Sequence, residues 1–323
     1  MRHITAEDIA RTLTYAELVE ALRRAFRDDI TVPIRHHHSI PTPGGDATLL
    51  LMPAWTGDRT FIGCKLLTVF PDNATRGKPS VYGSYVLLSG ASGEPLAVMD
   101  GRELTAWRTG AASALAATYL ARAHASHLVM IGAGALAPHL IAAHAAVRPI
   151  RQVTLWNRTR ARAEMLAEKL AGRGMIVAVT DHLEAALGSA DIVSCATLSH
   201  HPLVRGGLLR AGVHVDLVGG FTPTMREADD ATVRRASLYV DTREGAREKA
   251  GDIVDPMWRG IIKEHDVRGD LFELCRGVSP GRQSADEITL FKSVGNALED
   301  LAAAMLVWER LVNVPSAAHP PAR

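Results

Sequence analysis

Three basic residues lie at positions where the surrounding pattern predicts apolar or small side chains. Lys65 interrupts a strand-like apolar run, Arg108 lies among alanine, threonine and glycine in a helical segment, and Arg35 begins a short basic stretch. Because burying a cation without an anion is costly, each needs an anionic partner. A carboxylate substrate held by lysine and arginine would explain all three. The alternatives are a lysine that reaches solvent from an edge strand and two structural salt bridges.

A second candidate site begins at Gly132, where another apolar run ends. The spacing from Gly132 through Gly134 to Ala137 is the G-x-G-x-x-A pattern of a dinucleotide-binding turn. Gly132 would permit a sharp reversal, and Gly134 would let the backbone approach a pyrophosphate. We expect Gly132, Gly134, Ala135 and Leu136 to contact a dinucleotide, with free amides at the helix start facing its phosphates. A plain turn between a buried strand and a helix has the same pattern, so the flanking sequence has to decide.

The next predicted strand ends in Asn157, Arg158 and Thr159, at the position where such folds read the adenosine ribose. An acid there would accept the ribose hydroxyls of NAD and repel the extra phosphate of NADP, whereas asparagine followed by arginine and threonine does the reverse. We therefore predict a preference for NADPH over NADH. Thr197 and Leu198 follow another strand at the same edge and are predicted to lie beside the dinucleotide. Ordinary helix-start and strand-end residues are the alternatives.

No metal site is predicted. His36, His37 and His38 are consecutive, and successive residues of an extended segment point to opposite faces, so they do not converge on one ion. His200 and His201 are interpreted as a loop pair. The three cysteines are far apart and adjoin apolar segments, which predicts reduced, buried thiols in a cytoplasmic protein.

The elements that must position these residues fall into two groups. Apolar runs between residues 48 and 99, joined by short turn-forming links, predict a largely antiparallel sheet behind two short helices. From residue 128 to 240, strand-like and helical segments alternate, which is typical of a parallel sheet covered by helices. We predict an α/β protein with a Rossmann-type dinucleotide-binding domain and an α+β domain. A small-residue helix at 105–120 should bridge them, and a long helix at 286–312 should return to the first domain.

These patterns predict one domain from residues 1–115 together with 293–323, and a Rossmann domain from 116–292. The tail 315–323 is expected to be disordered. The net charge of +1 over 323 residues provides no broad basic or acidic surface, so nucleic acid and membrane partners are not expected. No apolar run is long enough to span a membrane, and early acids exclude a secretory leader.

The chain resembles the ornithine cyclodeaminase/mu-crystallin family along nearly its whole length. The resemblance rests on Leu51-Met52-Pro53-Ala54, Lys65, Ala97-Val98-Met99-Asp100-Gly101, Leu104-Thr105-Ala106-Trp107-Arg108-Thr109, Gly132-Ala133-Gly134, Trp156-Asn157-Arg158-Thr159 and Phe291-Lys292-Ser293-Val294-Gly295. It implies that Arg35, Lys65 and Arg108 occupy substrate-carboxylate positions. It also implies that Ser293 lies near the nicotinamide and that the first domain mediates a homodimer.

Two departures from the cyclodeaminase pattern narrow the chemistry. Those enzymes carry an aspartate after the strand that ends here at Gly220, and a glutamate before the Leu-Met-Pro run; this chain has Phe221 and Leu50. It therefore lacks the carboxylates that would bind and deprotonate a second amino group. Phe221 resembles instead the members that reduce cyclic imino acids. An apolar ring suits a cyclic aliphatic substrate, so we expect Phe221 to contact it.

The resemblance thus implies NADPH-dependent reduction of Δ1-pyrroline-2-carboxylate or Δ1-piperideine-2-carboxylate to L-proline or L-pipecolate. Lys65 and Arg108 would be catalytic, because they would hold the carboxylate while the cofactor delivers hydride. The alternatives are an ornithine cyclodeaminase with bound NAD, an amino-acid dehydrogenase of the alanine type, and a non-catalytic NADPH-binding protein like mu-crystallin. Phe221 and Arg158 favour a reductase over a cyclodeaminase, and intact Lys65 and Arg108 favour catalysis over binding alone.

Overall fold

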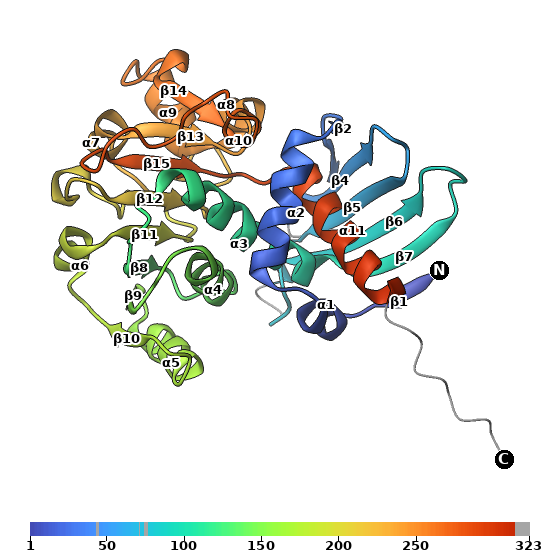
Figure 1. Ribbon diagram of the computed structural model, residues 1–323, viewed down its shortest axis with the longest axis horizontal. Helices are drawn as coiled ribbons and strands as arrows, with labels where there is room; N and C mark the ends of the chain where they lie inside the picture. The colour runs from blue at the N-terminus through green and yellow to red at the C-terminus, as the bar shows by residue number, and fades with distance from the viewer. Residues whose placement is uncertain (43–44, 71, 74–76, 314–323) are drawn as a thin grey trace.

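The computed structural model describes residues 1–42, 45–70, 72–73 and 77–313. Two β-sheets lie side by side, each with its own helices, and helix α3 (Gly101–Leu120) runs between them (Figure 1). The tail 315–323, for which we predict disorder, lies outside the described residues. In the described part of the chain, no helix combines the length and apolarity needed to cross a lipid bilayer.

The first sheet has seven strands in the order β1-β7-β6-β5-β4-β2, with β3 paired to β4. Every pairing is antiparallel except that of β1 with β7, which confirms the predicted antiparallel character. The strands are β1 (Arg2–Ile4), β2 (Ile30–Thr31), β3 (His36–Ile40), β4 (Ala47–Thr56), β5 (Phe61–Val69), β6 (Val81–Ser89) and β7 (Pro95–Asp100).

One face of this sheet is covered by helices. Because side chains alternate along a strand, the register places Met52, Lys65, Tyr85 and Met99 in one row across β4, β5, β6 and β7, and all four are buried. Packed on this lobe are α1 (Ala6–Thr12), α2 (Tyr15–Arg27), α3 and the C-terminal α11 (Ala297–Asn313). Lys65 is therefore the charged member of an apolar row under α3 and α11.

The second sheet has eight parallel strands in the order β10-β9-β8-β11-β12-β15-β13-β14. Helices lie on both of its faces, which is why its strands are near-continuous apolar runs (Figure 1). The strands are β8 (His127–Ile131), β9 (Gln152–Trp156), β10 (Ile176–Val179), β11 (Ile192–Cys195), β12 (His214–Leu217), β13 (Ser237–Val240), β14 (Val267–Asp270) and β15 (Thr289–Lys292).

The helices of this lobe are α4 (Ala137–Val147), α5 (Arg160–Leu170), α6 (Leu183–Ser189), α7 (Asp230–Arg235), α8 (Arg243–Lys249), α9 (Gly251–Trp258) and α10 (Leu271–Cys275), with short 3₁₀ turns η2 (Gly206–Leu208) and η3 (Glu264–Asp266). The predicted α/β class with a Rossmann-type sheet is confirmed.

The predicted helix at 286–312 is wrong in its first third. Residues 289–292 form β15, an inner strand between β12 and β13, and α11 begins only at Ala297. The run Thr289-Leu290-Phe291-Lys292 is fully buried and its backbone bonds to strands on both sides, so sheet pairing overrides any helical tendency. Gly295, with φ +83°, then lets the chain turn toward the first lobe.

The two lobes meet at the carboxyl end of β15. There Arg35 donates to the carbonyl oxygen of Gly295 at 3.0 Å, and Gly295 packs against the Arg108 guanidinium. Helix α3 contacts β6 on one side and β12 and β15 on the other. The domain boundaries at 115/116 and 292/293 therefore stay a prediction, because α3 belongs to both cores.

Candidate active site

The turn after β8 has the geometry of a phosphate-binding loop. Gly132 has φ +101°, and a side chain there would approach the Ala196 carbonyl oxygen within 2.6 Å. A Cβ on Gly134 would meet nothing within 4 Å, so this residue faces open space. Among the described residues, no group accepts a hydrogen bond from the amides of Gly134, Ala135 and Leu136, which precede α4. These free donors at a helix start fit a dinucleotide pyrophosphate.

Two residues after β9 differ in their contacts: Asn157 bonds to the glycine turn, and Arg158 has no partner among the described residues. The Asn157 side chain accepts from Ala133 N at 3.1 Å and donates to Thr159 O at 2.8 Å, so it joins the end of β9 to the glycine turn. Arg158 is exposed and, within the described ranges, has no hydrogen bond or ion pair. By contrast, Arg160 is paired with Glu164 and Asp181. Arg158 is therefore a guanidinium free to meet a phosphate directly after β9.

Four other predicted site residues follow strands at the carboxyl edge of the parallel sheet. Thr197 follows β11 and bonds through both its amide and its hydroxyl to Glu227. Leu198 and Phe221, after β11 and β12, are 68% and 53% exposed. Ser293, directly after β15, is buried and donates its amide hydrogen to Leu217 O. The structure brings these four residues, which follow three strands, to one edge of the sheet, and their roles toward ligands stay predictions.

The buried basic residues Lys65 and Arg108 are held by two acids from α11. Lys65 Nζ lies 2.6 Å from Asp300 Oδ2, and Arg108 Nε donates to Asp300 Oδ1 at 3.0 Å. Arg108 Nη1 donates to Glu299 Oε2 at 2.7 Å. Both acids are fully buried, and Lys65 is 1% exposed. The protein itself thus supplies acidic partners for both cations, Asp300 for Lys65 and Asp300 with Glu299 for Arg108.

This charged cluster lies directly behind the wall of a cavity of about 350 Å³ between the lobes. Arg35 lines the cavity itself, together with Met52 and Gly295. Met52 is the register neighbour of Lys65, and Gly295 packs against Arg108. Arg108 Nη2 donates to no group of the described residues. Arg35, Lys65 and Arg108 therefore lie close together, and their binding of a substrate carboxylate stays a prediction.

Burial tunes the acid–base properties of the cluster. It lowers the pKa of Lys65 to about 8, with the nearby Arg108 charge acting in the same direction and Asp300 opposing it. It raises the pKa of Glu299 to about 7, against the opposing effect of Arg108. The Lys65 ammonium is therefore a stronger acid than that of an ordinary lysine, with a pKa closer to neutral pH.

The histidine runs singled out in the sequence lie at the surface of the part of the chain that the structure describes. His36, His37 and His38 form part of β3 and are exposed, with the His36 and His38 rings 6.4 Å apart. His200 lies in the loop after β11, where its Nδ1 is 3.0 Å from Thr224 O. In the described ranges, no group of three histidine, cysteine, aspartate or glutamate side chains could hold a metal ion. The three cysteines are free, and two of them are buried.

Sequence reasoning missed the acids Glu299, Asp300 and Glu227, and it did not single out Lys292. Acids in the first turn of a helix are ordinary, so Glu299 and Asp300 gave no signal of burial. Lys292 follows Leu290 and Phe291 in an apolar strand, which is the same signal that identified Lys65. Glu227 lies in a loop, and its partners are distant in sequence.

A parallel sheet with a glycine turn and free amides at its carboxyl edge is typical of a dinucleotide-binding protein. A family model described as ornithine cyclodeaminase/mu-crystallin family matches residues 3–314. The chain belongs to this family.

Named relatives and solved structures are similar over nearly the whole chain. A Δ1-pyrroline-2-carboxylate reductase from Colwellia psychrerythraea is 37% identical over 321 residues, 97% of this chain and 100% of the relative. The Thermococcus litoralis Δ1-pyrroline-2-carboxylate reductase, in complex with NADH and L-proline, has a TM-score of 0.90 at 34% identity and covers 97% and 98% of the two chains. An archaeal alanine dehydrogenase dimer with bound NAD has a TM-score of 0.88 at 30% identity, covering 97% and 96%.

Proposed function

We propose that this protein reduces a cyclic imino acid, Δ1-pyrroline-2-carboxylate or Δ1-piperideine-2-carboxylate, to L-proline or L-pipecolate with NADPH. The observation that carries the proposal is the pair of buried cations, Lys65 and Arg108, behind a cavity at the carboxyl edge of a dinucleotide-binding sheet. Relatives that are named for reduction of such an imine, and that align over nearly the whole chain, support it.

The side chains of this protein bind and orient the substrate. Arg35 and Arg108 Nη2 attract its carboxylate, and the Lys65 ammonium neutralises it or passes a proton to the imine nitrogen. NADPH, when bound, supplies the hydride that adds to the imine carbon. Because Asp300 contacts both Lys65 and Arg108, it fixes their spacing and keeps the site from carrying two unbalanced positive charges. Positioning is then the main contribution of the protein.

The preference for NADPH is part of the proposal. Arg158 is exposed and free of protein partners, so it can pair with the 2′-phosphate at no cost in existing contacts. Asn157 brings no negative charge to that edge. Gly132, Gly134, Ala135, Leu136, Thr159, Thr197, Leu198 and Ser293 are proposed to complete the cofactor site.

We also propose that the protein forms a homodimer in the cytoplasm. Trp55, Leu66 and Tyr82 share the face of the first sheet opposite Lys65 and are 37%, 37% and 49% exposed. A row of large apolar side chains on an outer sheet face favours burial against a second copy. The free cysteines favour a reducing compartment.

A spectrophotometric panel tests the reaction. NADPH oxidation is followed with Δ1-pyrroline-2-carboxylate, Δ1-piperideine-2-carboxylate, and pyruvate plus ammonia, and release of ammonia from ornithine is followed with NAD. We expect oxidation with one or both cyclic imines and neither of the other reactions. Activity only with pyruvate and ammonia, or only with ornithine, would replace the proposal. Inactivity with all four would favour a binding protein.

A further inference from the structure

Glu227 joins two loops at the carboxyl edge of the parallel sheet. Its Oε1 accepts from Thr197 N at 2.7 Å and from Thr197 Oγ1 at 2.9 Å. Its Oε2 accepts from Gly219 N at 2.8 Å and from Gly220 N at 3.3 Å. One fully buried carboxylate thus binds the chain directly after β11 and directly after β12.

The two loops are packed against each other where Glu227 holds them. A side chain on Gly219 would come within 1.9 Å of the Thr197 carbonyl oxygen, so a shift of one loop has to move the other. Leu198 and Phe221, the exposed residues at this edge, are each one residue beyond a bonded position. The Glu227 carboxylate therefore fixes the backbone positions from which the Leu198 and Phe221 side chains project.

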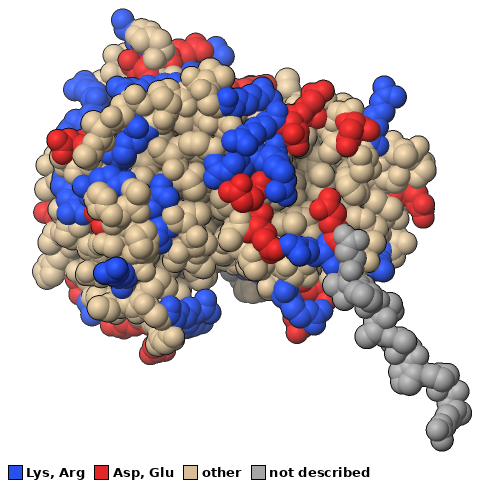
Figure 2. All heavy atoms as spheres, in the orientation of Figure 1, with Lys and Arg blue, Asp and Glu red and all other residues tan. Residues whose placement is uncertain are grey.

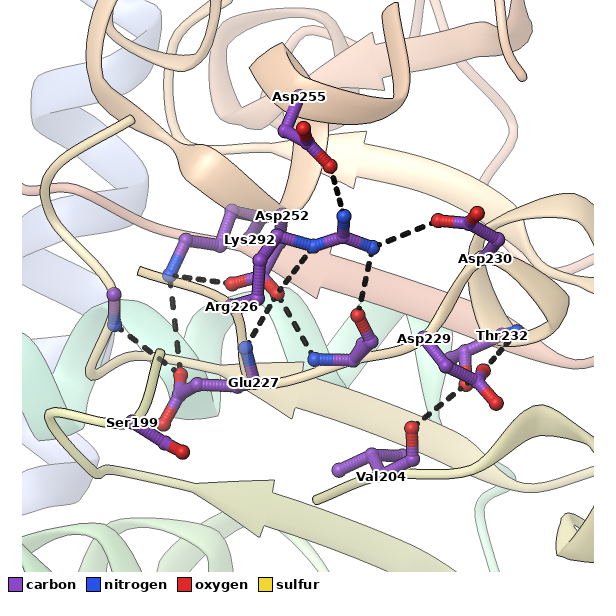
Figure 3. A network of polar contacts seen from close by, with 12 residues as sticks. Ser199, Val204, Arg226, Glu227, Asp229, Asp230, Thr232, Asp252, Asp255 and Lys292 are labelled. Atoms are coloured by element: carbon purple, nitrogen blue, oxygen red, sulfur yellow. Dashed lines mark hydrogen bonds and ion pairs between the residues drawn. The ribbon is translucent and has the colours of Figure 1, made fainter. Parts of the chain in front are cut away.

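Glu227 is surrounded by a network of charged residues that includes Lys292, Asp252 and Arg226 (Figure 3). Lys292 Nζ, fully buried at the end of β15, lies 3.9 Å from Glu227 Oε2 and 3.5 Å from Asp252 Oδ2. Asp252 Oδ1 accepts from the backbone amides of Glu227 at 2.7 Å and Ala228 at 2.9 Å. Arg226 is anchored outward by Asp255 and Asp230. The backbone and the side chain of Glu227 are both fixed.

We propose that Glu227 is a positioning residue of the reductase: it sets the spacing of the Thr197 loop and the Gly219–Gly220 loop, and thereby the alignment of nicotinamide and imine between them. This inference rests on the proposed function. All four groups that Glu227 bonds are donors, so both of its oxygens have to accept. A glutamine of the same shape would place an amide NH₂ against one loop and break that half of the contact.

Glu227→Gln tests the inference by two independent measurements. Hydrogen–deuterium exchange should become faster in at least one of the segments 196–199 and 218–221, the one that the amide NH₂ faces, and stay unchanged at 293–296. The kcat for the imine, counted per NADPH-binding chain, should fall about tenfold or more, while the NADPH Kd from fluorescence titration changes less than about threefold. Unchanged exchange in both loops, or altered exchange with unchanged kcat, would overturn it.

A matched control is available at the opposite edge of the same sheet. Asp191 is also a buried carboxylate on backbone amides, those of Ser126 at 2.8 Å and His127 at 3.0 Å, and it is paired with Arg122. Asp191→Asn should lower the unfolding temperature but leave kcat and the exchange of 196–199 and 218–221 unchanged. An equal loss of kcat in this control would reduce Glu227 to a purely structural role.

Thr197→Val keeps the experiment decisive if Glu227→Gln fails to fold. It removes one of the four donors without changing shape, so kcat should fall about twofold to tenfold, and Thr197→Ser should restore it. Equal kcat in Thr197→Val and wild type would overturn the inference. If wild-type protein reduces none of the imines, the proposed function fails, whereas exchange and NADPH titration still decide whether Glu227 sets the loops.

Discussion

Two buried lysines of this protein are surrounded by carboxylates in different ways. Lys65 lies 2.6 Å from Asp300, and the adjacent Arg108 forms close bonds with Asp300 and Glu299. Lys292 lies 3.5 and 3.9 Å from Asp252 and Glu227, and the closest contacts of those two acids are with backbone amides. In the first cluster the carboxylates bond mainly to other side chains, and in the second they bond mainly to the backbone.

The difference separates two tasks. In the first cluster Arg108 Nη2 has no hydrogen-bond acceptor among the described residues, and a cavity lies just beyond, so we propose that this cluster meets a ligand. In the second cluster the carboxylates are used to hold loops, and Lys292 offsets their charge. The carboxylates of the first cluster thus bind basic side chains, whereas those of the second bind mainly backbone amides, which suits them to hold loops in place. Figure 2 shows one face of the surface of the molecule. Basic and acidic side chains are interspersed over this face, except for a group of basic side chains over the upper part of α2.

The largest expected effect comes from Lys65→Met. Because it removes the buried ammonium, turnover of the cyclic imine should fall by about 10²–10⁴-fold, the range for loss of a positioned acid. NADPH binding, measured by fluorescence, should stay within about twofold of wild type. Unchanged turnover would remove Lys65 from the mechanism.

Lys292→Met should act on stability instead. It leaves Glu227 and Asp252 buried without their cation, so the free energy of unfolding should fall by about 3–5 kcal/mol. Denaturant unfolding followed by circular dichroism measures it, with Lys292→Arg as the charge-preserving control. A loss that Lys292→Arg reproduces in full would assign the effect to packing rather than charge.

Arg158→Ser should change the choice of cofactor. Loss of a charge-assisted contact to the 2′-phosphate should reduce the NADPH-to-NADH ratio of kcat/KM about tenfold to a hundredfold. The exposed Arg162, on the same helix start, provides the control variant Arg162→Ser, for which we expect no change. An unaltered ratio in Arg158→Ser would place the phosphate elsewhere.

The pH dependence of kcat/KM should reflect the titration of Lys65. Its pKa is lowered to about 8, so the ammonium form is present below that pH and is lost as pH rises through it. The kcat/KM should therefore decline about tenfold per pH unit above 8. Lys65→Arg keeps its charge at every accessible pH, so this limb should disappear in that variant. Persistence of the limb in Lys65→Arg would assign it to another group.

The sequence pointed to Lys65 and to the glycine turn, but not to Lys292. Lys65 breaks an alternating strand, and the glycine turn follows an apolar run, so local pattern was enough to find both. The strands of the parallel sheet up to β13 were predicted by alternation with helices. Strand β15 was assigned to a helix because its neighbours β12 and β13 are distant in the chain.

The partners of the candidate site could not be predicted. Asp300 contacts Lys65, which lies 235 positions earlier in the chain. Glu227 contacts Thr197 and Lys292, which lie in different segments of the chain. Such contacts depend on how the two sheets and α11 pack, which no local period encodes. Asn157 was predicted to face the ribose, and only the structure reveals its bond to Ala133 N.

The most direct test of the division between the two lysines is the binding of pyrrole-2-carboxylate, a planar carboxylate that cannot be reduced as a cyclic imine. Calorimetric titration in the presence of NADP⁺ compares wild type, Lys65→Met and Lys292→Arg. We predict a Kd about tenfold to a hundredfold weaker for Lys65→Met and unchanged for Lys292→Arg. Equal affinity in wild type and Lys65→Met would contradict the assignment of Lys65 to the substrate.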